Sequence, residues 1–285
     1  MDKNSPIALF DSGVGGLTIA KEIINEFPNE KIIYFGDTAH LPYGPRNQSE
    51  VRGFVMDIIE YFHSLKAKMI IIACNTATAA GLREVQEVFD TPIIGPIEPG
   101  VGEGVLATKN KRIGVIATEG TIASGAYQNS LKRVGPDLEV FAKACPEFIP
   151  LVEEGELYTL KAKKVAQRYL VPLREEGIDT LILGCTHFPY LGKIISEVMG
   201  EGVELIYPGK SIALKVKNLL KEENILQENK LEVNNKFYVS DLNRVSQNFV
   251  ELGKDFLGFK ELDFEELDLW SYKAKVNRGE TLIQP

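Results

Sequence analysis

The sequence has few of the residues that usually hold metals or cofactors. Its 285 residues include three cysteines, three histidines and one tryptophan, and the cysteines form no C-x-x-C pair. With an odd number of cysteines and no export signal, we expect free thiols rather than a disulfide framework. A thiol redox or zinc protein is an alternative, but zinc ligands are too few unless Asp11 joins two cysteines and a histidine. We therefore predict no metal site.

A long apolar run and a basic patch are also missing. The stretch MDKNSPIALFDSG leads into a predicted strand without the charged and apolar regions of a signal peptide, and no run reaches membrane-spanning length. Lysine and arginine number 32 against 40 acidic residues, for a net charge of −8, and the basic residues are scattered. The sequence therefore predicts a cytoplasmic protein that binds neither membrane nor nucleic acid.

The most informative feature is a segment that occurs twice, around two of the cysteines. MIIIACNTATAAG surrounds Cys74 and TLILGCTHFPYLG surrounds Cys185. Each has an apolar run, a small residue, a cysteine and, within two positions, a threonine. Because open α/β sheets bind ligands at the carboxyl ends of their strands, the duplication predicts two similar halves that each present a thiol to a shared cleft. The alternative is that each cysteine is a small buried hydrophobic residue.

Short apolar runs alternate with amphipathic stretches, which is typical of parallel sheets covered by helices. Strands are predicted over Ile7–Phe10, Lys31–Gly36, Met69–Ala73, Pro92–Ile94, Arg112–Ala117, Leu138–Lys143, Thr180–Leu183, Glu204–Tyr207 and Lys236–Ser240. Helices are predicted over Leu17–Phe27, Glu50–Leu65, Ala79–Phe89, Thr121–Arg133, Thr159–Glu176, Leu191–Met199, Lys210–Asn224 and Asn243–Leu257. A capping box of Asn47 and Glu50 is expected to start the second helix.

The repeat extends to the scale of domains. IALFDSGVGGLTIAKEI and IGVIATEGTIASGAYQNSL share a strand, a polar turn and a helix, and each precedes one cysteine segment. The expected fold class is α/β, with two pseudo-symmetric α/β domains, mainly parallel sheets and the active site in the cleft between them. Pro/Gly-rich connections at GPIEPG and YPG predict a first domain of residues 1–96 plus 209–269 and a second of 97–208. Residues 270–285 are expected to be a tail or a partner-contacting arm.

Each repeated cysteine has a candidate proton partner. A thiol has an ordinary pKa of about 8.5, so a catalytic cysteine needs a proton partner or a helix N-terminus. Asp11 ends the first strand on the same rim as Cys74, and His187 lies two residues from Cys185. The alternatives are a helix N-cap for Asp11 and a loop-fixing role for His187. The turn DSGVGG matches neither common phosphate-binding motif, and its aspartate would repel an anion, so nucleotide binding is not expected.

Polar neighbours distinguish these two cysteines from the third. Asn75, Thr76 and Thr186 supply hydrogen-bonding groups beside the thiols, at positions where helix N-termini favour a bound carboxylate. Cys145, which a proline follows directly, is interpreted as structural. His40 is expected near the cleft.

Five motifs carry a family resemblance. They are FDSGVGGLT at 10–18, DTAHLPYG at 37–44, ACNTAT at 73–78, PLVEEG at 150–155 and GCTHFPYL at 184–191. In order and spacing, over about residues 6–265, the chain resembles the glutamate racemases of the aspartate/glutamate racemase superfamily. Aspartate racemases are similar in outline, but the histidine of GCTHFP and the form CNTAT favour glutamate.

The resemblance implies a reaction and a set of site residues. It implies cofactor-independent interconversion of L- and D-glutamate, with D-glutamate feeding peptidoglycan synthesis. Cys74 would act on the D-enantiomer with help from Asp11, and Cys185 on the L-enantiomer with help from His187 and Glu153. The positions that match substrate-binding residues of the family are Asp11, Ser12, Tyr43, Gly44, Asn75, Thr76, Thr186 and His187, with Thr118 and Thr121 as additions.

Two further alternatives concern partners. A two-lobed solute-binding protein would share the cleft without needing thiols, although such proteins are usually exported. The acidic stretch Glu261–Asp268 is compatible with a partner-binding role. For an enzyme of this kind we expect a homodimer.

Overall fold

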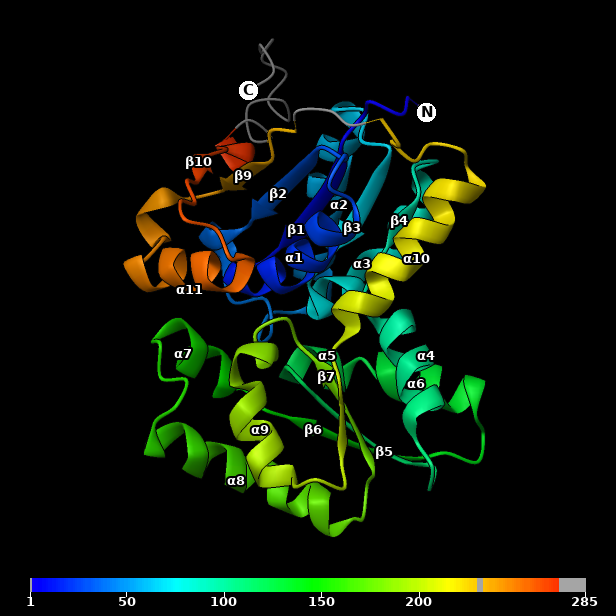
Figure 1. Ribbon diagram of the computed structural model, residues 1–285, viewed down its shortest axis with the longest axis vertical. Coiled ribbons are helices and arrows are strands. Elements are labelled where there is room, and N and C mark those ends of the chain that lie inside the picture. Colours follow the sequence, from blue (N-terminus) through cyan, green and yellow to red (C-terminus); the bar gives the residue numbers. More distant parts are fainter. Residues whose placement is uncertain (1, 230–232, 272–285) are drawn as a thin grey trace.

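The fold consists of two parallel β-sheets, each covered by helices on both faces (Figure 1). The computed structural model describes residues 2–229 and 233–271. A six-stranded sheet has the order β10-β9-β2-β1-β3-β4 and a four-stranded sheet the order β6-β5-β7-β8. Every strand pair is parallel. The predicted class of two α/β halves with parallel sheets is confirmed.

The same strand order occurs in both halves. The order β2-β1-β3-β4 in the first sheet corresponds to β6-β5-β7-β8 in the second. The strands of the first sheet are β1 Ile7–Asp11, β2 Ile32–Gly36, β3 Met69–Ile72, β4 Ile93–Ile94, β9 Lys236–Val239 and β10 Glu265–Glu266. Those of the second are β5 Arg112–Ala117, β6 Glu139–Ala144, β7 Thr180–Gly184 and β8 Glu204–Ile206. The central strands β1, β3 and β7 are buried at every residue, as expected for strands covered on both faces.

Helices connect the strands in the usual parallel-sheet pattern. They are α1 Leu17–Glu26, α2 Gln48–Ser64, α3 Asn75–Val88, α4 Ile97–Ala107, α5 Glu119–Ala123, α6 Ala126–Val134, α7 Phe148–Glu153, α8 Leu160–Glu175, α9 Gly192–Met199, α10 Pro208–Glu222 and α11 Gln247–Leu257. Short 3-10 turns are η1 Val14–Gly16, η2 Thr38–His40, η3 Phe188–Leu191 and η4 Leu242–Arg244. Among the described residues, no helix is both long and apolar enough to cross a membrane.

Several predicted elements were wrong. The single helix predicted over Thr121–Arg133 is two helices, because Gly125 adopts a left-handed conformation with φ of 70° between α5 and α6. Helix α4 was not predicted, since its prolines and glycines suggested a connection; Pro99 lies in its first turn, where a missing N–H costs little. Helix α7 was also missed. Asn47 makes no side-chain capping bond at the start of α2, and Glu50 pairs with Arg46 instead, at 2.5 Å.

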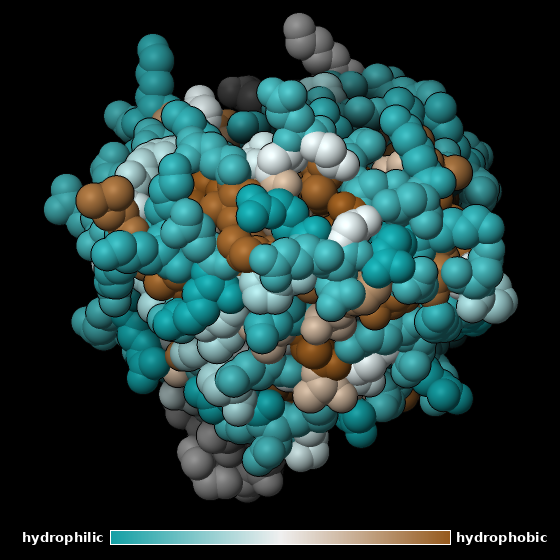
Figure 2. Space-filling model, turned by 90° about the horizontal axis from the view of Figure 1, so that it is seen from below, coloured by the Kyte–Doolittle hydropathy of each residue, from teal (hydrophilic) through white to brown (hydrophobic). Residues whose placement is uncertain are grey.

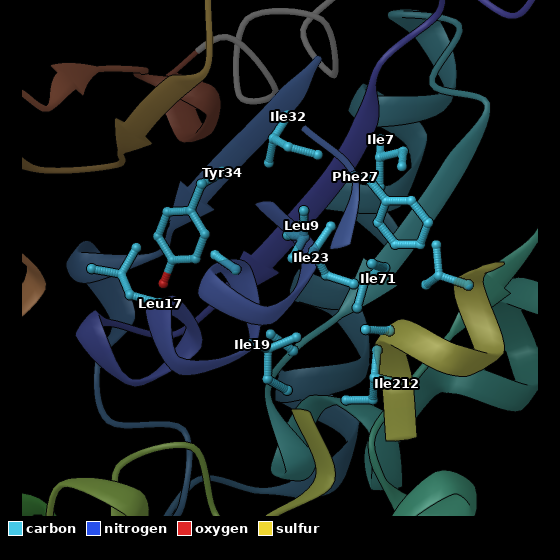
Figure 3. Close-up of a cluster of buried hydrophobic side chains, with 14 of the residues drawn as sticks. Ile7, Leu9, Leu17, Ile19, Ile23, Phe27, Ile32, Tyr34, Ile71 and Ile212 are labelled. Atoms are coloured by element: carbon cyan, nitrogen blue, oxygen red, sulfur yellow. The ribbon is translucent and has the colours of Figure 1, made fainter. Parts of the chain in front are cut away.

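The chain returns to the first sheet after crossing the second. Helix α10 follows β8 and buries Ile212, Val216 and Leu220 in the same apolar cluster as α1 and β1 (Figure 3). Strands β9 and β10 then extend the first sheet beyond β2. Trp270 begins the segment predicted as a tail, yet its indole donates a 2.8 Å hydrogen bond to Asp37. Residues 272–285 of that segment lie outside the described residues.

The outer face of the second half is mostly hydrophilic, with small separate apolar areas (Figure 2). Within this half, Tyr158 and Leu160 are 70% and 79% exposed. Isolated exposed apolar side chains of this kind are normal on a protein surface.

A buried ion pair lies at the amino ends of the strands in the first sheet, on the side away from the second half. Lys68 Nζ is 2.5 Å from Glu30 Oε2, and both side chains are almost fully buried. The same ammonium donates to the carbonyl oxygens of Lys3 and Ile225, and Glu30 accepts from the N–H of Gln227. Burial lowers the pKa of Lys68, although the Glu30 carboxylate acts in the opposite direction. Each charge is therefore costly without the other.

Removing one partner of this pair should destabilise the fold strongly. We expect Glu30→Leu to lower the free energy of unfolding by about 3–5 kcal/mol, because it leaves the Lys68 ammonium buried and unpaired. The double variant Glu30→Leu/Lys68→Met should recover most of this loss. Urea unfolding measures both, with Glu87→Ala in the exposed Arg83–Glu87 pair as a control that should barely change stability. A single variant as stable as the control would contradict this interpretation.

Candidate active site

The carboxyl ends of the two sheets meet at one interface. Cys74 follows β3 as the N-cap residue of α3, and Cys185 follows β7 directly. Both thiols are free and buried, with 6% and 5% of their surfaces exposed. Loops from the two halves contact one another beside them, so groups that are far apart in sequence meet at one buried interface.

Asp11 lies at the centre of this interface and is fully buried. It ends β1, the strand beside β3, so its carboxylate lies on the same rim as Cys74. Oδ1 accepts a 3.1 Å hydrogen bond from the N–H of Gly13. Oδ2 accepts a 3.0 Å hydrogen bond from Thr186 Oγ1 in the other half. The carboxylate therefore belongs to the first thiol's rim and contacts the second thiol's loop.

Burial dominates the protonation of Asp11 and Cys74. It raises the pKa of Asp11 to about 6, although His187 and the hydrogen bonds from Gly13 and Thr186 act in the opposite direction. Burial also raises the pKa of Cys74 well above the ordinary thiol range, and the negative charge of Asp11 adds to that shift. Cys74 is therefore a neutral thiol at neutral pH.

The second thiol has a different electrostatic environment. His187 Nδ1 lies 4.0 Å from Cys185 Sγ, and its Nε2 lies 2.8 Å from Glu153 Oε1. Burial alone would lower the pKa of His187, but the Cys185 sulfur and the Glu153 carboxylate, one at each ring nitrogen, raise it well above its ordinary value. The imidazole is therefore a cation beside the sulfur. Glu153, at the end of α7, contacts His187 and is partly exposed.

The motif DSGVGG has glycines at positions where a side chain would collide with its neighbours. A β-carbon on Gly15 would lie 2.4 Å from Thr186 Oγ1 and 2.6 Å from His187 Nδ1. One on Gly16 would lie 2.4 Å from the β-carbon of Asp11. Gly15 therefore lets the Asp11 turn pack against the Thr186–His187 turn, and Gly16 lets its own turn pack closely on Asp11.

Threonines from both halves form a second contact across the interface. Thr76 Oγ1 is 2.9 Å from Thr118 Oγ1 and 3.2 Å from Thr121 Oγ1. The carbonyl oxygen of Gly44 accepts a 2.9 Å hydrogen bond from the N–H of Gly120. All three threonines are buried, so the cleft is closed on this side.

Two cavities flank the thiol loops. One of about 300 Å³ is lined by Cys185, Thr186 and Asn75, with Tyr207 and Lys210 at α10. The other, of about 290 Å³, is lined in part by Gly44, Thr118 and Glu153. Predicted site residues therefore line both cavities.

Of the other predicted residues, Ser12 lies beside Asp11, and the rest contact Asp37 or lie in a core. Ser12 is buried next to Asp11. Tyr43 lies in the core of the first half, and its hydroxyl donates to Asp37 Oδ2 at 2.6 Å. His40 also contacts Asp37, 2.9 Å away, and Cys145 is fully buried in the core of the second half. Asp37 begins the motif DTAHLPYG but was not predicted as a site residue, and its contacts with His40, Tyr43 and Trp270 hold that loop in place.

Among residues 2–229 and 233–271, no group of three or more His, Cys, Asp and Glu side chains is arranged to hold a metal ion.

Comparison with known proteins places this geometry in a family. Residues 17–215 match the family described as Asp/Glu/hydantoin racemase. The chain is 42% identical over 267 residues to a glutamate racemase from Geobacter metallireducens, covering 94% of this chain and 98% of the relative. It is 41% identical to one from Oceanobacillus iheyensis, covering 98% and 99%.

Solved structures of glutamate racemases have a similar fold. A glutamate racemase from Bacillus anthracis superposes with a TM-score of 0.88 at 38% identity, covering 94% of this chain and 98% of that one. One from Francisella tularensis, in complex with D-glutamate, superposes with a TM-score of 0.87 at 36% identity, covering 95% and 100%.

The buried carboxyl of Asp11 should titrate near pH 6. Carbon-13 NMR of aspartate-labelled protein should show its midpoint near 6, well above the ordinary value, because burial favours the protonated form. Thr186→Val should raise the midpoint further, since it removes a hydrogen bond to the ionised form. Asp179, whose pKa is lowered by hydrogen bonds from Thr108, Asn110 and Lys109 that outweigh its burial, serves as the control. An Asp11 midpoint near 4 would contradict the desolvation argument.

Proposed function

The chain belongs to the Asp/Glu/hydantoin racemase family and is an isomerase, and on this premise we propose that it interconverts L- and D-glutamate through two thiols. The observation that carries the proposal is the pair Cys74 and Cys185, buried at one interface, at the ends of matching strands. Each has its own proton partner, Asp11 for the first and His187 for the second.

The reaction removes a proton from one face of Cα and adds a different proton to the opposite face. With L-glutamate, the Cys185 thiolate removes the α-proton, so the C–H bond breaks and an S–H bond forms. The Cys74 thiol then delivers its proton to the opposite face of the carbanion, which gives D-glutamate. The reverse reaction uses each sulfur in the other role. The neutral state of Cys74 supports its assignment as the proton donor in the L-to-D direction.

The charges of His187 and Asp11 determine how each assists its thiol. His187, held between Cys185 and Glu153, is a cation that favours negative charge on the sulfur and can exchange a proton with it. Asp11, with a pKa of about 6, is largely ionised at neutral pH and can accept the Cys74 proton when D-glutamate is the substrate. The two thiols therefore have opposite electrostatic environments in similar backbone settings.

The carbanion needs stabilisation by fixed dipoles. An α-carbanion without an electron-sink cofactor depends on positioned donors in a water-excluded site. The N-terminus of α3, at Asn75 and Thr76, supplies such donors at a buried interface. The residues proposed to bind substrate are Asp11, Ser12, Tyr43, Gly44, Asn75, Thr76, Thr118, Thr121, Thr186 and His187.

The choice of glutamate rests on the family. Pocket packing alone discriminates one methylene only about 10- to 200-fold, and the two relatives compared above, at 42% and 41% identity, are named glutamate racemases. We further propose a homodimeric, cytoplasmic enzyme whose D-glutamate supplies peptidoglycan synthesis, as the motif resemblance implies.

The direct test is incubation of EDTA-treated protein with L-glutamate, followed by chiral chromatography. We expect D-glutamate to accumulate until the two enantiomers are equal, because they have equal free energy. L-aspartate in a parallel incubation should react at least about tenfold more slowly. If no D-glutamate forms, the proposal fails.

Only two of the three cysteines should be essential. Cys74→Ser and Cys185→Ser should each lower kcat for racemisation at least about 1000-fold, because a serine hydroxyl is a far weaker acid than a thiol. Cys145→Ser is the matched control, since Cys145 is buried in the core of the second half, and its kcat should stay within about threefold. Substantial racemisation by either of the first two variants would refute the two-thiol assignment.

The pH profile should report the ionisation of Asp11. Protonation removes the carboxylate that accepts the Cys74 proton, so kcat/KM should fall as pH drops below about 6. The fall should be equal in both directions, because the equilibrium constant is one. Asp11→Asn should lower kcat/KM about a hundredfold and lose this acid limb. An acid limb that persists unchanged near pH 6 in the variant would assign it to another group.

A further inference from the structure

Tyr127 contacts the neighbours of both thiols. It lies in the first turn of α6, fully buried in a core cluster with Ile182 of β7. Its hydroxyl donates a 2.7 Å hydrogen bond to Oδ1 of Asn75, the residue after Cys74 in the other half. No motif or periodicity in the sequence identifies Tyr127 as a functional residue.

The ring of the same tyrosine packs on the second thiol's strand. A β-carbon on Gly184, the residue before Cys185, would lie 2.8 Å from Cε2 of Tyr127. A β-carbon on Gly100 of α4 would lie 3.6 Å from the Tyr127 hydroxyl. The ring is thus held against β7 and the hydroxyl is enclosed, so that Asn75 is its partner across the interface.

The direction of this hydrogen bond determines what Asn75 can offer a ligand. A tyrosine hydroxyl that donates to Oδ1 occupies the acceptor side of the amide, and the Nδ2 hydrogens remain as donors. Asn75 lines the 300 Å³ cavity together with Cys185 and Thr186. A carboxylate only accepts hydrogen bonds, so this amide orientation suits an anionic substrate group and the flipped orientation would repel it.

The protonation state of Tyr127 supports the same direction. Burial raises the pKa of its hydroxyl above the ordinary tyrosine value, and the nearby Cys185 sulfur adds to the shift. The phenol therefore keeps its proton at neutral pH and stays able to donate to Asn75.

We propose that Tyr127 is a positioning residue that holds the Asn75 amide with its nitrogen toward the cavity, where it donates to a carboxylate of the substrate. The inference rests on the proposed glutamate racemisation and adds a residue from the second half that orients a substrate contact in the first.

The test is the kinetics of Tyr127→Phe, after wild-type racemisation of glutamate has been established. Without the hydroxyl, the amide is free to flip, so we expect KM for both enantiomers to rise about tenfold while kcat stays within about threefold. The contact to a carboxylate is similar in ground and transition states, so its loss raises mainly KM. Tyr169→Phe removes a half-buried hydroxyl that bonds Glu147 in the second half, and as the matched control it should leave both constants unchanged.

A double-mutant cycle separates positioning from general packing. If Tyr127 acts through Asn75, the variant Asn75→Ala/Tyr127→Phe should have the KM of Asn75→Ala within about twofold. Multiplied effects, an unchanged KM in Tyr127→Phe, or a loss confined to kcat would each overturn the proposal. An inactive wild-type enzyme would instead refute the racemase assignment itself.

Replacement of Tyr127 by para-aminophenylalanine restores a donor and keeps the ring. We expect its KM to lie within about twofold of the wild type, and a tenfold rise would contradict the proposal. This variant carries the test if Tyr127→Phe does not fold.

Discussion

The carboxyl ends of two parallel sheets face each other, and this arrangement brings polar side chains of the two halves into contact beside both thiols. A residue that ends a strand in one half meets a residue that ends a strand in the other, as Asp11 of β1 meets Thr186 after β7 at 3.0 Å. The Thr76 contact with Thr118 and the Asn75 contact with Tyr127 repeat this across the interface. Because the side chains of Thr186 and His187 lie so close, the Asp11 turn needs a glycine at Gly15.

The two halves have similar backbones but different charges. Cys74 is a neutral thiol beside a carboxyl that burial keeps weakly acidic, whereas Cys185 lies beside a cationic histidine held by Glu153. A racemase must take a proton from either face of one carbon atom. Similar backbones set the two sulfurs in comparable positions, and unlike neighbours give them different proton partners, a carboxyl for Cys74 and an imidazole for Cys185.

Much of the fold could be predicted from the sequence, because buried strands and amphipathic helices have strong local periodicity. The strands at Ile7 and Thr180 and the parallel class follow from it. Helix α4 could not be predicted, since its stability comes from packing against α10 and α6 and its prolines suggest a turn. The contacts of Asp37 with Trp270 and of Tyr127 with Asn75 span 233 and 52 residues, which leaves no local pattern.

The central claim is that two thiols act on opposite faces of the substrate, and isotope distribution at low conversion tests it most directly. With L-glutamate in deuterated water, the account predicts that newly formed D-glutamate carries deuterium at Cα while the remaining L-glutamate keeps its protium. Each inversion then ends with a solvent-derived proton from the second sulfur. D-glutamate that retains the original protium would mean that one group carries the proton between faces, and it would contradict the account.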